Sequence, residues 1–296
     1  EKTFEGITYQ FFDAGHIPGS ASILLNVDGN NILYTGDIQV EESELLNPAD
    51  LDYGKDIDVL ICESTYGLRE HPKRIEEEKT FLEEVERTIQ LGGSVLVPVF
   101  GVGRAQEVIL MLSRLHTDVP IYLDGMAKKV TDLFLQKPKF LKDSNDLRNA
   151  KENVTYVKGR HMRNRIVNQQ SIVVSTSGMM TGGPIMFYTE KLKNDTKSSI
   201  LLTGYQADGT NGRSLLERGM IKVDGRPFKI KCKVSKFDFS AHAGLRGLKD
   251  LIKKINPKVL LLNHGDLESE DNLASWARQN NFDVKTLELG ESYNGA

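Results

Sequence analysis

The stretch SILLNVDGNNILYTGD, residues 22–37, predicts two short strands joined by a tight turn. Two apolar runs flank a turn that contains an Asp-Gly pair, which is a signal of a β-hairpin. The stretch ends in an acid, Asp37, just past the second apolar run. A further apolar run, IDVLICE at residues 57–63, also ends in an acid, Glu63. The first part of the chain therefore predicts a sheet whose strand ends are followed by carboxylates.

Beyond this sheet, short apolar runs alternate with amphipathic segments. This alternation indicates an α/β protein, and in the middle of the chain it is typical of a parallel, doubly wound sheet. The strands expected there span residues 94–99, 119–124, 171–176 and 199–204, and the helices span 73–90, 103–115 and 183–193. A second hairpin is expected at residues 223–227. The end of the chain predicts a returning strand at 229–239, a helix at 244–255, a strand at 258–264, another helix and a strand at 282–289.

Length and composition are those of a globular protein. The 296 residues, 39% hydrophobic and 27% charged, allow two domains of ordinary size. The longest apolar runs fall well short of the roughly 20 residues that a membrane helix needs, and the first residues do not resemble a signal peptide. The two cysteines, Cys62 and Cys232, lie in separate strand-like runs without metal-type spacing. We therefore expect reduced thiols, no membrane attachment and a cytoplasmic location.

Charge is distributed unevenly along the chain, whose formal net charge is −3. Residues 67–230 contain 26 Lys and Arg residues and 19 Asp and Glu residues, a net charge of +7. The two flanks together contain 12 basic and 22 acidic residues, a net charge of −10. A basic middle between acidic ends is the pattern of a protein that holds a polyanion over a cation-binding site. Chance variation in a charged surface explains the same pattern equally well.

Five residues with metal-binding or acid–base side chains share one placement, at or just past the end of an apolar run: His16, Asp37, Glu63, His242 and His264. Strand ends fix the backbone while the following loops let side chains converge, as an α/β active site requires. Imidazole and carboxylate ligands suit zinc, and a carboxylate shared by two ions favours phosphodiester hydrolysis. The remaining histidines lack this placement and are expected on the surface: His71, His116 and His161.

Two glycine-rich turns, at residues 97–109 and 175–184, follow expected strands and precede expected helices. Such turns either make tight strand-to-helix connections or offer backbone N–H groups to a phosphate. The residues expected to contact phosphate or RNA are Arg104, Ser177, Gly178 and Ser240. The first turn, GVGRAQ, also matches two of the three glycines of a dinucleotide-binding fingerprint. A dinucleotide-dependent enzyme, however, leaves the strand-end histidines unexplained.

Several stretches, in order along nearly the whole chain, resemble the motifs of metallo-β-lactamase-fold nucleases that have the β-CASP insert. They are GHIPGSAS at 15–22, YTGD at 34–37, ESTYG at 63–67, FSAHA at 239–243 and NHGD at 263–266. The resemblance is to the archaeal and bacterial RNA-processing branch, akin to RNase J and to the endonuclease of the eukaryotic pre-mRNA cleavage and polyadenylation factor. It implies metal ligation by His16, Asp37 and His264, with Asp37 bridging two zinc ions. It also implies catalytic roles for Glu63, His242 and Asp37.

The resemblance implies a zinc-dependent ribonuclease acting in RNA processing or decay, by an endonuclease or exonuclease mode. A histidine at position 264 implies RNA rather than DNA as substrate. Two zinc ions would activate water and stabilise charge on the phosphoryl oxygens. His242 would protonate the leaving oxygen or stabilise the transition state, and Glu63 would keep its imidazole oriented.

The resemblance also divides the chain. Residues 1–66 and 231–296 are expected to form a partial αββα metallo-β-lactamase domain, and residues 67–230 an inserted doubly wound β-CASP domain. The His-x-His-x-Asp-His motif expected upstream of His16 does not occur in the sequence. We therefore expect this chain to be the incomplete C-terminal portion of a nuclease that lacks the N-terminal half of the metallo-β-lactamase domain. Alone, it is expected to bind zinc poorly and to have little nuclease activity. The alternative function is a non-catalytic subunit that clamps RNA in a processing complex. The sequence is compatible with a homodimer as well as with such a complex.

Overall fold

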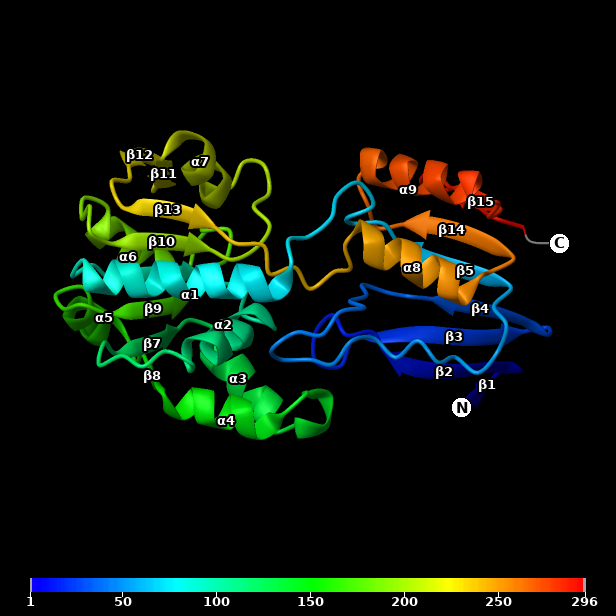
Figure 1. The fold of residues 1–296 in the computed structure, drawn as a ribbon, viewed down its shortest axis with the longest axis horizontal. Coiled ribbons are helices and arrows are strands. Elements are labelled where there is room, and N and C mark those ends of the chain that lie inside the picture. The colour runs from blue at the N-terminus through cyan, green and yellow to red at the C-terminus, as the bar shows by residue number, and fades with distance from the viewer. Residues whose placement is uncertain (1, 295–296) are drawn as a thin grey trace. The chain divides into compact units, whose positions relative to one another are not determined.

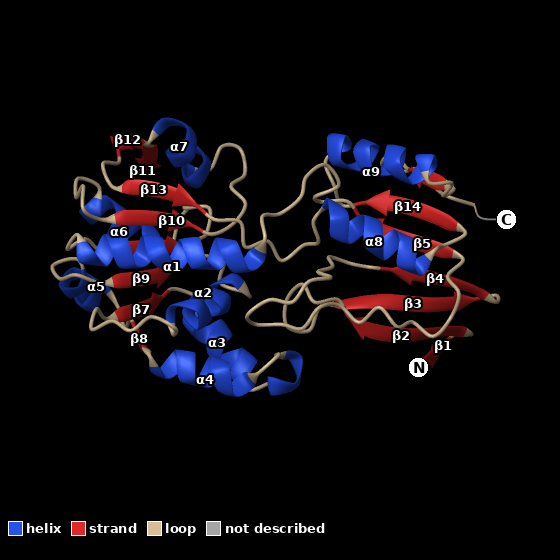
Figure 2. Cartoon of the chain, viewed as in Figure 1, coloured by secondary structure: helices blue, strands red, loops and turns tan. Residues whose placement is uncertain are grey.

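A computed structural model describes residues 2–294, and the chain divides into two compact units, each built from strands and helices (Figures 1 and 2). The first unit comprises Glu1–His71 and Ala241–Ala296, and the second comprises Pro72–Ser240. Both units contain parallel strand pairs and helices, so the expected α/β class is confirmed.

The first unit contains a seven-stranded mixed sheet in the order β1-β2-β3-β4-β5-β14-β15. Its strands are β1 (Lys2–Phe4), β2 (Ile7–Asp13), β3 (Ala21–Val27), β4 (Asn30–Tyr34), β5 (Val59–Glu63), β14 (Val259–Asn263) and β15 (Val284–Thr286). Strands β1 to β4 pair antiparallel, whereas the pairings from β4 to β15 are parallel. The parallel pair of β5 and β14 places Glu63 directly beside Asn263, so both strands end at the same edge.

The predicted hairpin is confirmed between β3 and β4. Val27 pairs with Asn30, and the two loop residues, Asp28 and Gly29, have φ angles of 49° and 86°. Positive φ at both central residues is the geometry of a type I′ turn, which matches the twist of the flanking strands. The second predicted hairpin is also present, between β11 (Met220–Val223) and β12 (Arg226–Lys229).

Helices α8 (Leu245–Ile255) and α9 (Leu267–Gln279) pack on one face of this sheet. Their apolar side chains form a core with strand residues that include Leu33 and Leu60, both fully buried. The opposite face is also apolar, since the row Phe11, Ile23, Tyr34 and Ile61 runs across four paired strands. Phe11 is 57% exposed and Tyr34 is 37% exposed, so this second face is open to solvent at these positions.

The second unit contains a six-stranded, wholly parallel sheet in the order β13-β10-β6-β9-β7-β8. Its strands are β6 (Val95–Pro98), β7 (Ile121–Asp124), β8 (Val154–Tyr156), β9 (Ile172–Ser175), β10 (Ser199–Leu202) and β13 (Lys233–Lys236). Its helices are α1 (Arg74–Gln90), α2 (Arg104–Leu112), α3 (Ala127–Leu135), η1 (Pro138–Phe140), α4 (Ser144–Glu152), α5 (Arg160–Ile166), α6 (Pro184–Leu192) and α7 (Asn211–Arg218). The four central strands are buried along their whole length.

Helices cover both faces of this sheet, with α1 and α2 in front of the strands and α5 and α6 behind them in Figure 1. Strands covered on both faces must be apolar throughout, which explains the continuous apolar runs of the sequence. On one face Leu96, Val173 and Ile200 pack with the α6 side chains Ile185 and Tyr188. The predicted doubly wound arrangement is confirmed.

The boundaries between the units differ from the expected ones. Residues 231–240 were expected in the first unit but belong to the second, which spans Pro72–Ser240. The physical reason is strand β13, which pairs parallel with β10 and extends the second sheet by one strand. At the other boundary the first unit continues to His71.

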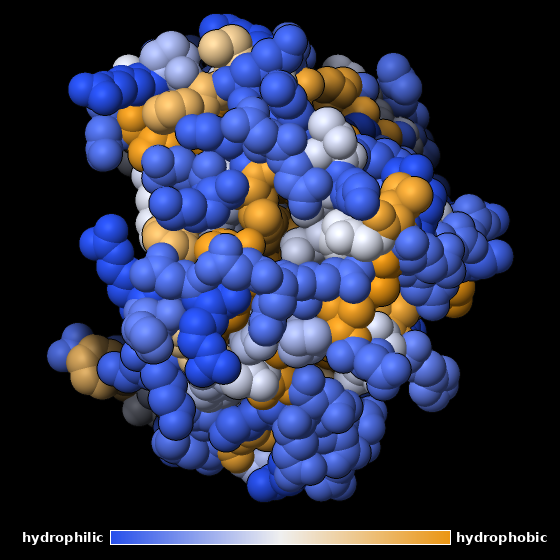
Figure 3. Space-filling view, turned by 90° about the vertical axis from the view of Figure 1, so that its left-hand side faces the viewer, coloured by the Kyte–Doolittle hydropathy of each residue, from blue (hydrophilic) through white to orange (hydrophobic). Residues whose placement is uncertain are grey.

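One face of the molecule is covered mainly by hydrophilic side chains, with apolar side chains gathered in narrow strips between them (Figure 3). Apolar atoms on a folded surface are normal when they are dispersed in this way. Among residues 2–294, no helix has both the length and the apolar character required to cross a membrane.

Candidate active site

His16 lies in a tight loop that follows β2. The hydroxyl oxygen of Ser20 accepts hydrogen bonds from the backbone N–H groups of His16 and Ile17, each at 3.2 Å. Gly15 has a φ angle of +68°, and a Cβ at this position would stand 2.5 Å from the carbonyl oxygen of Gln39. Only glycine fits such a position, so the loop holds His16 close against the segment that follows β4.

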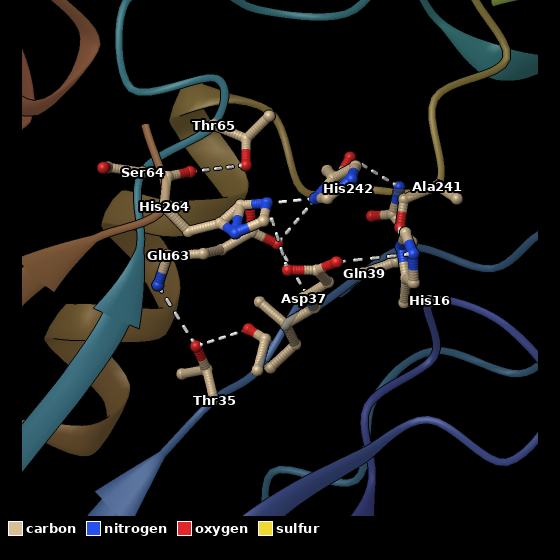
Figure 4. Close-up of polar contacts among 12 residues, drawn as sticks. His16, Thr35, Asp37, Gln39, Glu63, Ser64, Thr65, Ala241, His242 and His264 are labelled. Atoms are coloured by element: carbon tan, nitrogen blue, oxygen red, sulfur yellow. Dashed lines mark hydrogen bonds and ion pairs between the residues drawn. The ribbon is translucent and has the colours of Figure 1, made fainter. Parts of the chain in front are cut away.

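Asp37 follows β4 and lies between two histidines (Figure 4). Its Oδ2 is 3.7 Å from Nε2 of His16, and its Oδ1 is 3.5 Å from Nε2 of His264. The side chain of Asp37 is 34% exposed, so solvent reaches it. Each oxygen of one carboxylate thus faces a different imidazole.

Glu63 is the last residue of β5 and is 1% exposed. Both of its oxygens lie 3.0 Å from Nδ1 of His242, and Oε1 also accepts the backbone N–H of Ile38 at 2.6 Å. Burial raises the pKa of this carboxyl, but its hydrogen bond and charge interaction with His242 outweigh burial and hold the pKa below its usual range. Glu63 is therefore an ionised, buried partner of the His242 imidazole.

His242 and the preceding residue organise the site through their main chain. The carbonyl oxygen of Ala241 lies 2.9 Å from Nδ1 of His16, which requires a proton on that nitrogen and leaves Nε2 facing Asp37. Burial lowers the pKa of His16, although the bond to Ala241 opposes this shift. The neutral imidazole is the form that binds metals, so His16 is prepared as a ligand.

His264 directly follows β14 and is the most exposed of the three site histidines, with 54% of its side chain accessible. Its φ angle is +52°, an uncommon conformation for a residue with a side chain. The hydroxyl of Thr65 donates to its carbonyl oxygen at 2.9 Å, which ties this loop to the segment after Glu63. The ring of His264 is therefore more accessible to a ligand than those of His16 and His242.

The structure brings all five strand-end residues together in the first unit. Potential ligand atoms of His16, Asp37 and His242 lie within 4.8 Å of one another, and the rings of His16 and His242 are 4.5 Å apart. The expected ligand set was His16, Asp37 and His264. His264 reaches Asp37 but lies outside this tighter group, and its ring is 6.1 Å from that of His242. The tighter group and the expected set each consist of two imidazoles and a carboxylate, a donor set that suits zinc.

The expected phosphate-binding residues have other surroundings. Arg104 is 7% exposed and makes an ion pair with Glu107, which also accepts from Arg74 at 3.1 Å. The guanidinium is therefore paired with a buried carboxylate, and the assignment of Arg104 to phosphate binding stays a prediction. A buried charge requires such a partner, which the sequence pattern did not reveal.

The second glycine-rich turn is a tight connection in this structure. Gly178 is buried, and a Cβ at this position would stand 2.9 Å from the backbone nitrogen of Phe100. Ser177 directs its hydroxyl inward, to the carbonyl oxygen of Gly182 at 3.2 Å. Ser240 is half-buried and ends the second unit. The assignment of these three residues to RNA binding stays a prediction.

Two residues of the site were missed by the sequence analysis. His71, expected on the surface, is half-buried, and its Nε2 lies 3.1 Å from the carbonyl oxygen of His242. Gln39 is 7% exposed and donates to the same oxygen at 2.9 Å. The only sequence signal for these two residues is that they lie near other site residues in the chain. Gln39 follows Asp37 by two residues, and His71 follows the ESTYG stretch. His116 and His161 are exposed, as predicted.

Comparison with known proteins finds two family models and several relatives that match this chain. A Beta-Casp domain model matches residues 105–215, and a model described as Zn-dependent metallo-hydrolase RNA specificity domain matches residues 227–287. The chain is 43% identical to Probable RNase MJ4 of Methanocaldococcus jannaschii, over 98% of this chain and 69% of that protein. It is 37% identical to RNase aCSPSF2 of Saccharolobus solfataricus, over 98% of this chain and 59% of that protein. Transcription termination factor FttA of Methanococcus maripaludis is 36% identical, over 90% of this chain and 46% of that protein.

The chain thus spans between 46% and 69% of the length of these relatives. The family models cover most of the second unit and the C-terminal part of the first, and two of these relatives match nearly the whole chain. The α/β architecture with parallel strands agrees with these matches. The chain therefore belongs to the β-CASP family of metallo-β-lactamase-fold ribonucleases.

Proposed function

We propose that this chain is part of a zinc-dependent ribonuclease that hydrolyses phosphodiester bonds during RNA processing or decay. The placement of Asp37, with one oxygen toward His16 and the other toward His264, is the main support. Ligand atoms on one tetrahedral zinc lie about 3.3 Å apart when the bonds are about 2.0–2.1 Å long. The separations of 3.7 Å and 3.5 Å are close to this value, so each side of Asp37 suits one cation.

In this proposal His16, Asp37 and His264 would hold metal, which would supply Lewis acidity to the attacking water and to the phosphoryl oxygens. The bond from the water oxygen to phosphorus forms as the bond to the leaving oxygen breaks, and the proton that the water loses passes to solvent. Glu63 holds Nδ1 of His242, so Nε2 is the nitrogen that can deliver a proton to the leaving oxygen. The ionised, buried Glu63 carboxylate stabilises the positive charge of the imidazolium before transfer and fixes the ring orientation.

We also propose that the catalytic centre takes further ligands from outside this chain. A catalytic zinc ion usually has three protein ligands, and three residues are too few for two ions even when one of them bridges. The relatives named above are longer than the matched region, so they have additional chain that can supply ligands. Alone, this chain would bind zinc weakly and turn over little RNA.

The test compares this chain alone with the same chain joined to the part of Probable RNase MJ4 that lies outside the match. The joined protein should bind zinc and cleave an RNA oligonucleotide. Asp37→Asn and His242→Ala should each lower its rate by at least about 100-fold, the scale on which a lost transition-state contact acts. Asp56→Asn, which alters an exposed acid of the same unit, is the matched control and should leave the rate unchanged.

The outcomes separate the alternatives. Full cleavage by Asp37→Asn would overturn the metal-centre assignment. Robust zinc binding and turnover by this chain alone would overturn the incomplete-site proposal. RNA binding without cleavage by the joined protein would favour the non-catalytic clamp.

A further inference from the structure

Four exposed apolar side chains lie at the ends of neighbouring strands in the second unit. Phe100 and Val102 follow β6, Met126 follows β7 and Tyr205 follows β10, and they are 37%, 39%, 58% and 57% exposed. The strand order β10-β6-β9-β7 places their loops along one edge of the parallel sheet. We call these residues, Phe100, Val102, Met126 and Tyr205, the apolar rim. The carboxyl edge of a parallel sheet is where α/β proteins bind ligands.

Two members of the rim lie directly on glycine backbone. A Cβ at Gly204 would stand 3.1 Å from Cε2 of Phe100, and a Cβ at Gly101 would stand 2.9 Å from Cε of Met126. No other side chain fits at either glycine without a shift of the ring or the thioether. The glycines thus support the inner side of each group while its other side remains accessible.

Two buried glutamines tie the loops of the rim together in pairs. Gln206 donates to the carbonyl oxygens of Gly178 at 3.1 Å and Gly204 at 3.2 Å, joining the loops after β9 and β10. Gln106 donates to the carbonyl oxygens of Gly101 and Ala127, each at 3.3 Å, joining the loops after β6 and β7. The glutamine side chains are 3% and 0% exposed, so water does not compete for these bonds. The rim is therefore a preorganised surface rather than a set of loose loop tips.

The net charge of the second unit indicates which kind of molecule binds to this surface. The second unit contains 28 Lys and Arg residues against 19 Asp and Glu residues, a net charge of +9, which attracts a polyanion. The rim itself consists of aromatic and aliphatic groups, which do not bind phosphate. A ligand with an anionic backbone and flat apolar faces satisfies both observations, and single-stranded nucleic acid has this chemistry.

We propose that the apolar rim stacks against unpaired bases of single-stranded RNA, with Phe100 and Tyr205 as the stacking rings. This inference rests on the proposed ribonuclease function and specifies its substrate as an unpaired strand at this point. In duplex RNA the base faces are hidden by stacking and pairing, so a duplex offers the rim only phosphates and sugars. The rim therefore selects by strandedness and tolerates different base sequences, because every base has a flat face.

The test measures fluorescence anisotropy of a labelled RNA oligonucleotide with this chain and its Phe100→Ala, Tyr205→Ala and doubly substituted variants. Loss of one stacked base costs about 1–3 kcal/mol, so each single change should weaken binding between about 5-fold and 150-fold. Leu91→Ala is the matched control, because Leu91 is a 54% exposed apolar residue of the same unit at the end of α1. It should leave affinity unchanged. Circular dichroism melts verify that every variant is folded.

A second ligand isolates base contacts from backbone contacts. Abasic RNA of the same length should bind the unaltered chain more weakly than intact RNA, and the double variant should bind both equally. Equal affinity of the unaltered chain and the double variant for intact RNA would overturn the stacking proposal and leave the ribonuclease proposal standing. Preference for duplex over single strands would overturn it too. No RNA binding by the unaltered chain would also overturn it, whereas the ribonuclease proposal fails only if the joined protein does not cleave.

Discussion

The buried charges around Arg104 provide a sharp test of whether this residue serves stability or RNA binding. Arg104 and Arg74 both contact Glu107, Arg74 also bonds to Glu78 at 2.6 Å, and Glu78 accepts from Arg114 at 2.8 Å. We call these five residues, Arg74, Glu78, Arg104, Glu107 and Arg114, the Arg104 network. We expect Arg104→Gln and Glu107→Gln each to destabilise the second unit strongly without changing the RNA affinity of the folded protein.

The magnitude follows from burial. Arg104 is 7% exposed and Glu107 is 5% exposed, and breaking a buried ion pair costs about 3–5 kcal/mol because the remaining charge has lost its partner. Arg104→Gln should cost about 3 kcal/mol, since Glu107 keeps Arg74, whereas Glu107→Gln should approach 5 kcal/mol because two guanidinium groups lose a carboxylate. At about 2–4 °C per kcal/mol for a unit of this size, the melting temperature should fall by roughly 6–20 °C.

Differential scanning calorimetry is the suitable assay, because the single tryptophan, Trp276, lies in the first unit and tryptophan fluorescence would not report on the second. Arg213→Gln is the control: Arg213 is 46% exposed and pairs with Glu217 on the surface of α7, so its loss should cost under about 1 kcal/mol. Unchanged stability of Arg104→Gln, combined with weaker RNA binding and a shallower salt dependence, would refute the reasoning and support the phosphate-binding role.

Three further results are expected. Gly15→Ala should destabilise the first unit by at least about 2 kcal/mol in calorimetry, since a methyl group there meets backbone atoms at a strained positive φ; an unchanged transition would contradict this. Cys62 and Cys232 should resist thiol reagents at neutral pH until the chain unfolds, because burial raises the pKa of both thiols, that of Cys232 to about 11. Fast labelling of the native protein would contradict this expectation. Burial raises the pKa of Glu63, but its interactions with His242 outweigh burial and lower the pKa below its ordinary value of 4.5, so the ionised form stabilises the fold above that pH. This stability is lost as the pH falls below 4.5, and Glu63→Gln should show a shallower acid dependence of urea unfolding than the unaltered chain.

The hairpins and the strand-end residues could be predicted because local rules govern both. An Asp-Gly pair between apolar runs selects a type I′ turn from the sequence of the turn alone, as at Asp28 and Gly29. The convergence of Glu63 and His264 follows from two parallel strands that end at the same edge. Parallel pairing in the second unit could be predicted from the continuous apolar runs, because parallel sheets are covered by helices on both faces and their strands therefore have no polar side.

Residues that act through distant partners could not be predicted in the same way. The position of His71 depends on the carbonyl oxygen of His242, 171 residues away in the chain. Arg104 pairs with Glu107 of its own helix, and Glu107 in turn contacts Arg74 of the neighbouring helix α1, a contact that the sequence of the glycine-rich turn does not reveal. Strand β13 was expected beyond the boundary of the second unit, and its pairing with β10 is set by long-range sheet formation.

The main-chain carbonyl groups of Ala241 and His242 hold the ring of His16 and the side chains of Gln39 and His71. A carbonyl oxygen is the same in every residue type, so exchange of the side chain at position 241 leaves the contact with His16 available. An insertion or deletion in this segment would instead displace both acceptors together and misalign His16 and His242 at once. Evolution can therefore vary the chemistry at position 241 more freely than the number of residues between β13 and α8, and alignments should show a fixed spacing there.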